Sequence, residues 1–77
     1  MSRADIEKDV RHSMQAYFDD LGDNEPHGIY DMVMHVVEKP LLEDVMARAN
    51  HNQSLAAQWL GLNRNTLRKK LLAHKLI

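Results

Sequence analysis

Residues 52–71 read NQSLAAQWLGLNRNTLRKKL. The side chain of Asn52 can accept a hydrogen bond from a free backbone N–H, so it predicts the start of a short helix over Gln53–Leu60. Gly61 follows where the chain has to turn with a positive φ, a conformation that glycine adopts without a steric penalty. Asn63 then predicts the cap of a second helix. Two short helices joined by a glycine turn are typical of the helix–turn–helix motif.

The second of these helices, predicted from Arg64 to about Leu72, combines an apolar inner face with a basic outer face. Leu67 and Leu71 are four residues apart, so they lie on one side of it. The N-terminus of a helix offers N–H groups to a phosphate, and arginine and asparagine match the edges of guanine and adenine. We therefore expect this helix to read DNA. The candidate base readers are Arg64 and Arg68, and the candidate phosphate contacts are Asn52, Gln53, Asn63, Thr66, Lys69 and Lys70.

Charge is divided unevenly along the chain. Residues 50–77 contain no acidic side chain and five Lys or Arg, a net charge of +5. Residues 1–49 hold all eleven acidic residues against five Lys or Arg, a net charge of −6. The formal net charge of −1 for the whole chain conceals this division. A basic end predicts a polyanionic partner, and beside a helix–turn–helix pattern it favours double-stranded DNA.

Length and composition limit the remaining possibilities. Seventy-seven residues form at most one domain, and a core of this size is marginal. There is no cysteine, so disulfides and thiolate zinc sites are excluded and oligomerisation is the common remaining means of stabilisation. The apolar runs are far shorter than the ~20 residues that span a membrane, and the charged N-terminus does not resemble a secretion signal. We therefore expect a cytoplasmic protein without a membrane partner.

Two longer helices are predicted before the helix–turn–helix. In the first, apolar residues recur at three- and four-residue steps, and Leu21–Gly28 then forms a breaker-rich loop. The second helix runs from about Ile29 to Arg48 and is apolar on more than one side, so it should be buried nearly all round. One chain of this size cannot bury it, and we expect two copies to cross in a homodimer. The predicted interface residues are Val33, Val36, Val37, Pro40, Leu41 and Val45.

Three residue types leave alternatives open. Pro40 predicts a kink near Val36–Pro40, and the alternative is two helices that break at Lys39. The methionines of this segment suit irregular gaps between crossing helices, and the alternative is that they pack a monomeric core. Trp59 is expected either in the core or as a plug at an interface.

Signals for catalysis or for a cofactor are poor. Asp31, His35 and Glu38 fall on one helical face and could in principle hold a divalent metal, but such a scattered set is more typical of surface residues. The histidines predicted to stand alone are His12, His27 and His74. No Ser-His-Asp arrangement, glycine-rich phosphate loop or paired buried carboxylates are apparent. We therefore expect no enzymatic activity, no metal and no cofactor.

Residues 53–71 resemble the corresponding segment of Fis, the bacterial family named for the factor for inversion stimulation. The resemblance extends upstream to the segment that forms the family's dimerisation core with its kinking proline, and it covers about residues 5–77. The residues that carry it are Asn52-Gln53, Ala56-Ala57, Gly61, Asn63–Leu71, Tyr17-Phe18, Leu21, Tyr30, Val37–Leu42 and Val45-Met46.

The resemblance implies an all-α fold with four helices per chain and an intertwined homodimer. Within one domain over residues 1–77 it implies dimerisation helices over about 4–49 and a helix–turn–helix region over about 50–77. Two recognition helices would sit closer than one turn of B-DNA, so the duplex would bend, with loose readout of groove shape. The implied roles are nucleoid organisation and transcription control, with double-stranded DNA, a second copy of the chain and RNA polymerase as candidate partners. The implied DNA contacts are Asn52, Gln53, Asn63, Arg64, Asn65, Thr66, Arg68 and Lys69.

The sequence departs from this family at both ends of the pattern. It starts almost at the first helix, so it resembles a short form without the β-hairpin arm that contacts a recombinase. Leu72 and Ala73 stand where lysine is common, and His51 stands where glycine is usual. We therefore expect weaker contacts to flanking DNA, with His51 adding charge when protonated.

Two further interpretations remain beside the Fis resemblance. One is the Fis-like terminal domain of NtrC-type activators, although Met1 and the complete dimer segment favour a free-standing protein. The other is a dimeric helical adaptor that binds protein rather than DNA, and it would not need arginine on the second short helix.

Overall fold

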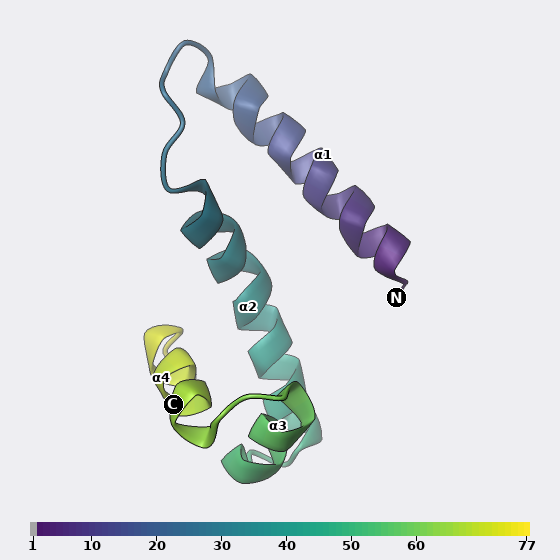
Figure 1. Ribbon diagram of the computed structural model, residues 1–77, viewed down its shortest axis with the longest axis vertical. Helices are drawn as coiled ribbons and strands as arrows, with labels where there is room; N and C mark the ends of the chain where they lie inside the picture. Colours follow the sequence, from purple (N-terminus) through teal and green to yellow (C-terminus); the bar gives the residue numbers. More distant parts are fainter. Residues whose placement is uncertain (1) are drawn as a thin grey trace.

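The computed structural model describes residues 2–77, which form four α-helices and no strand (Figure 1). In chain order these are α1 (Arg3–Leu21), α2 (Ile29–Arg48), α3 (Gln53–Leu60) and α4 (Arg64–Ala73). The predicted all-α fold with four helices is therefore confirmed. Within the described residues, no helix is both long and apolar enough to cross a lipid bilayer.

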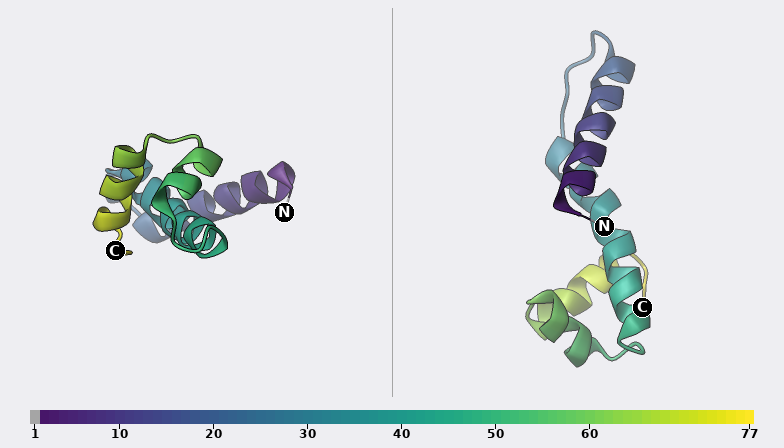
Figure 2. Two further views of the ribbon diagram at one scale, coloured as in Figure 1. Left: turned by 90° about the horizontal axis from the view of Figure 1, so that it is seen from below. Right: turned by 90° about the vertical axis from the view of Figure 1, so that its right-hand side faces the viewer.

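α1 lies apart from the rest of the protomer. Its first turn is fixed by a capping box, in which the Ser2 hydroxyl accepts a hydrogen bond from the Asp5 N–H and the Asp5 carboxylate accepts one from the Ser2 N–H. None of its residues is buried, and Figures 1 and 2 show α1 and α2 diverging from the loop that joins them. The radius of gyration is 15.1 Å, whereas a compact chain of this length is expected near ~11–12 Å. The protomer is therefore extended.

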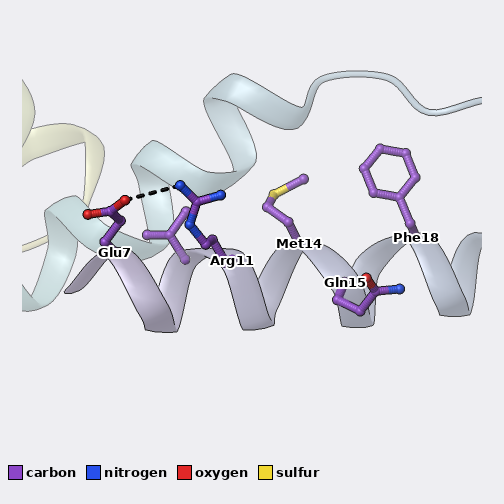
Figure 3. Close-up of a pocket in the computed structure, with 6 residues that line it drawn as sticks. Glu7, Arg11, Met14, Gln15 and Phe18 are labelled. Carbon is purple, nitrogen blue, oxygen red and sulfur yellow. Dashed lines mark hydrogen bonds and ion pairs between the residues drawn. The ribbon is translucent and has the colours of Figure 1, made fainter. Parts of the chain in front are cut away.

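Many apolar side chains of α1 and α2 face solvent in the protomer. Figure 3 shows Met14 and Phe18 on the side of α1 that carries the Glu7–Arg11 ion pair, where they line an open groove. On α2, Val36 is 66% exposed and Leu41 is 49% exposed. The exposed large apolar residues of the two helices are Ile6, Val10, Phe18, Tyr30, Met32, Met34, Val36, Val37 and Leu41. The alternative that the methionines of α2 pack a monomeric core is wrong for Met32 and Met34, because both are exposed.

α2 is one continuous helix with Pro40 inside it. The alternative of two helices that break at Lys39 is therefore wrong. Proline removes the N–H that would bond to the carbonyl of Val36, but both residues are exposed, so water can satisfy that carbonyl. Only the C-terminal part of α2, at Leu42 and Met46, is buried.

The core lies between the end of α2 and the two short helices. Ala56 and Ala57 of α3 are buried and allow close approach, while Leu67 and Leu71 of α4 are fully buried. The predicted inner face of α4 is thus confirmed. The complete buried cluster is Leu42, Met46, Ala49, Ala56, Ala57, Leu67 and Leu71, with Val45, Leu55, Leu60 and Leu76 packed against it. Every member falls within residues 42–76.

Trp59 does not join this core. Its side chain is 56% exposed, so the prediction of a core position is wrong, while an interface role stays a prediction. The residues of α3 that are buried are Ala56 and Ala57, and the indole ring lies outside this contact.

The two turns around α3 use the left-handed conformation in different ways. Gly61 has φ of 75°, as predicted for the turn between the short helices. Between α2 and α3, however, Asn50 has φ of 54° and His51 has φ of 62°. The His51 N–H donates to the carbonyl of Met46 at 2.8 Å, which closes the end of α2. Side chains with a Cβ are strained in this region, so the turn holds its direction at an energetic cost.

Candidate nucleic-acid interface

Two asparagines fix where the short helices begin. The Asn52 side chain accepts a hydrogen bond from the Leu55 N–H at 3.1 Å, and the Asn63 side chain accepts one from the Asn65 N–H at 2.8 Å. Both predicted caps are confirmed. Because each capping oxygen is occupied, the side-chain NH₂ group is left as a pair of donors, which suits an anion such as a phosphate.

α4 separates its buried leucines from its polar residues. Leu67 and Leu71 point into the core, whereas Arg64, Arg68 and Lys69 are exposed. Arg64 and Arg68 are one helical turn apart and therefore share one side of α4. The structure thus brings the predicted base readers together on the surface. The other predicted contacts that are exposed are Asn52, Asn63, Asn65 and Thr66, and Gln53 is half-buried at the start of α3.

Lys70 is placed differently from the other basic residues of α4. Its Nζ lies 2.8 Å from Oε2 of Glu38 on α2, and the two side chains are 36% and 21% exposed. The sequence predicts a phosphate contact at Lys70, but its ammonium has a carboxylate partner within the protomer. The adjacent Lys69 has no ion-pair partner in residues 2–77.

His74, at the C-cap of α4, shares the same carboxylate. Its Nε2 lies 2.9 Å from Oε1 of Glu38, and its side chain is only 3% exposed. Its ring also lies against the ring of His35 on α2, with centroids 4.5 Å apart. The prediction that His74 stands alone is therefore wrong. Glu38 is likewise not a simple surface residue, since it connects α2 to both ends of the last turn of α4.

The electrostatics of this cluster favour an ionised carboxylate. The hydrogen bond from Lys70 lowers the pKa of Glu38, and the bond to His74 lowers it further, although burial acts in the opposite direction. Each oxygen of this carboxylate is thus engaged by a residue at the end of α4. Within the described residues, no three His, Asp or Glu side chains gather closely enough to hold a metal ion.

No local signal in the sequence could reveal this cluster. Glu38 is 32 residues from Lys70 and 36 residues from His74, and α3 with its two flanking turns separates α2 from α4 in the chain. The one hint is that Lys70 and His74 are four residues apart, so they share a face of α4.

Comparison with known proteins agrees with this geometry. A family model described as "Bacterial regulatory protein, Fis family" matches residues 34–74, which span most of α2, both short helices and the C-cap of α4. The chain belongs to the Fis family.

Relatives that are named Fis-like and relatives that are named Fis both support the assignment. A protein of Ralstonia nicotianae, named as Fis-like and DNA-binding, is 54% identical over 77 residues, which is 100% of both chains. A similarly named protein of Neisseria meningitidis serogroup A is 56% identical over 73 residues, 95% of this chain and 92% of its own. The DNA-binding protein Fis of Proteus vulgaris is 44% identical over 62 residues, 80% of this chain and 67% of its own.

Proposed function

We propose that this Fis-family chain is a DNA-binding and DNA-bending transcription regulator that acts as a homodimer and contributes to nucleoid organisation. The observation that carries the proposal is the surface of α4. Its arginines and Lys69 are exposed on a helix whose other side is locked into the core by two fully buried leucines. No acidic residue occurs anywhere in residues 50–77 to oppose a polyanion.

In this proposal α4 enters the major groove with its N-terminus first. Arg64 and Arg68 read base edges, because a guanidinium can donate two hydrogen bonds to guanine. Asn63 and Thr66 contact phosphates at the start of α4, where the helix dipole also favours an anion, and Lys69 contacts a phosphate farther along the helix. Asn52 and Gln53 contact a flanking phosphate from the start of α3, and Asn65 lies beside the groove. Lys70 is left out of this set because its ammonium is paired with Glu38.

The homodimer is supported by the apolar surface that one protomer leaves open. A lone chain that exposes this many large apolar residues would be prone to association, and both the groove of α1 and the exposed face of α2 carry such residues. We propose that the partner's α1 and α2 cover these surfaces in an intertwined arrangement. The proposed interface residues are Val33, Val36, Val37, Pro40, Leu41 and Val45, of which Val33 and Val45 are already half-buried in the protomer.

Bending follows if the two copies of α4 lie closer together than one turn of B-DNA. A straight duplex could then not present both major grooves to the dimer at once, and sequence preference would come largely from how easily the duplex deforms. We therefore expect loose readout, with an advantage for duplexes that carry an A/T-rich centre.

The test is the affinity for an A/T-rich-centred duplex across a salt series, with two variants of α4. Steeply falling affinity with rising salt is expected for the wild type. Arg64→Ala should lower affinity by ~1–3 kcal/mol and relax base preference, whereas Lys69→Ala should weaken all sequences alike and flatten the salt dependence. Identical behaviour of the two variants would refute the division into readers and phosphate contacts. Weak binding that ignores salt would refute DNA binding and favour the protein-binding adaptor.

A further inference from the structure

One acidic side chain lies against the basic helix–turn–helix, and it comes from a different part of the chain. Glu38 on α2 places one carboxylate oxygen 2.8 Å from Lys70 Nζ and the other 2.9 Å from His74 Nε2. Lys70 lies in the last turn of α4 and His74 is its C-cap. A single side chain therefore ties the end of the recognition helix to α2.

The His74 side of this contact is shielded from water. Its side chain is 3% exposed, its ring is covered on one face by His35, and its Nδ1 is buried without a hydrogen-bond partner in residues 2–77. With the proton on Nε2, the bond to Glu38 is thus the one hydrogen bond that orients the buried ring. α3, which also packs on α4, contributes no titratable side chain that could replace it.

The Lys70 side of the contact bears on DNA binding. An ammonium that donates to a carboxylate at 2.8 Å is locally neutralised. It can pair with a phosphate only by leaving that carboxylate, so each such exchange adds little to the free energy of DNA binding. Lys69 is the next residue in the chain, is exposed and carries no such restraint. Two consecutive lysines therefore differ in what they offer to a polyanion.

We propose that Glu38 is a positioning residue for the DNA-reading helix, which fixes the end of α4 against α2 and withholds Lys70 from the phosphate backbone. The inference rests on the proposed DNA-binding function and deepens it. Glu38 does not touch DNA in this scheme, because it acts through Lys70 and His74. Since α2 is also the proposed dimer helix, the same carboxylate links the proposed dimer interface to the orientation of α4 in each protomer.

The deciding experiment measures duplex affinity against salt for wild type and Glu38→Gln. The amide keeps the shape of the side chain but removes the charge that holds Lys70. Release of Lys70 adds a phosphate contact, so the plot of log affinity against log salt should steepen by ~0.9 for each protomer bound. For two protomers, the affinity lost between 50 and 200 mM salt should then exceed the wild-type loss by about tenfold.

Two further variants separate release of Lys70 from the general loss of a negative charge. Glu43→Gln removes the same charge from the same helix, but Glu43 makes no ion pair within residues 2–77. It should therefore leave the slope unchanged. The double variant Glu38→Gln with Lys70→Met should lose the steepening, because the released ammonium is gone.

A comparison of the two lysines provides a test that does not depend on replacing Glu38. Lys69→Met should flatten the salt dependence by ~0.9 per protomer, whereas Lys70→Met should not. Equal flattening by both variants would overturn the inference, as would equal slopes for Glu38→Gln and Glu43→Gln. These outcomes leave the proposed function intact. A wild-type protein whose duplex affinity is flat with salt would instead overturn the proposed function and this inference together.

Discussion

Residues 3–41 and residues 42–77 use apolar side chains in opposite ways. In the first region, no residue of α1 is buried, and the N-terminal part of α2 leaves Val36, Val37 and Leu41 exposed. In the second region, seven residues that include three fully buried leucines close a small core around α3 and α4. The two regions hold a similar share of apolar residues, so the difference lies in what each can bury within one chain.

This difference indicates what each region needs in order to be ordered. The C-terminal region packs against the end of α2 and presents its basic face from a fixed support. The N-terminal region has the spacing of an amphipathic helix pair but no matching surface within the chain, so in the proposed homodimer a second copy buries it. The chain thus combines a locally completed core with the surface that we propose for assembly.

The largest expected effect comes from placing a charge in residues 3–41, where the apolar side chains are exposed. Leu41 is 49% exposed in the protomer, so Leu41→Asp would be tolerated by a monomer. In a dimer it would bury an uncompensated carboxylate, which costs several kcal/mol. We expect the dimer and most of the helical signal to be lost, as measured by sedimentation equilibrium and circular dichroism.

The matched control for this change is Leu72→Asp. Leu72 is 51% exposed, but it lies on α4 outside the proposed interface. It should leave the mass of the assembly unchanged. A folded, dimeric Leu41→Asp protein would show that the N-terminal region does not assemble through this face of α2.

The next largest effect should come from the core of the second region. Leu67→Ala removes a fully buried side chain and should destabilise the protein by ~2–5 kcal/mol. Trp59, the one tryptophan of the chain, lies on α3 and reports on this region by fluorescence. The urea midpoint followed at Trp59 should fall clearly, and an unchanged midpoint would mean that the small core contributes little.

A smaller effect is expected at the turns that orient the two short helices. A Cβ at Gly61 would meet no atom within 4 Å, so Gly61→Ala tests backbone strain alone at φ of 75°. Strain of this kind costs ~1–2 kcal/mol. His51→Gly should act in the opposite direction, because His51 already carries a Cβ at φ of 62°. Urea denaturation at one protein concentration measures both, and a stabilising Gly61→Ala would contradict the explanation.

The helix–turn–helix was predictable because its signals are local. Asn52, Gly61 and Asn63 each specify a conformation through their own side chain or its absence, and Leu67 and Leu71 reveal the inner face by their spacing. The helix boundaries of α3 were therefore predicted correctly, and α4 ends one residue later than expected. The sequence also shows directly that α2 is apolar on more than one side. The assembly that would bury this helix is an inference from that pattern.

The Glu38 cluster was not predictable because it depends on tertiary geometry. Nothing near Glu38 in sequence distinguishes it from an ordinary surface acid, and His74 looked isolated until α4 folded back onto α2. The left-handed turn at Asn50 and His51 was also missed, since neither residue requires that conformation. The exposure of Trp59 follows from close packing through Ala56 and Ala57, which residue type alone does not disclose.

The smallest expected effect is the response to acid of the contact that joins the two regions. Folding lowers the pKa of Glu38, because Lys70 and His74 bind its ionised form. Glu38 therefore contributes stability at pH values above its ordinary pKa of 4.5, and this contribution is lost as the pH falls through the lowered pKa. Glu38→Gln cannot titrate, so its urea midpoint should fall less than that of the wild type between pH 6 and pH 3.

The matched control is Glu43→Gln on the same helix, because Glu43 is exposed and makes no ion pair within residues 2–77. Its removal breaks no ion pair, so the acid response should stay close to that of the wild type. Protein concentration has to be held constant, because the midpoint of a dimer depends on it. If Glu38→Gln and Glu43→Gln responded alike to acid, the acid sensitivity would arise from the chain as a whole. A difference between them would locate it at the contact between Glu38 of α2 and the end of α4, which joins the first region to the second.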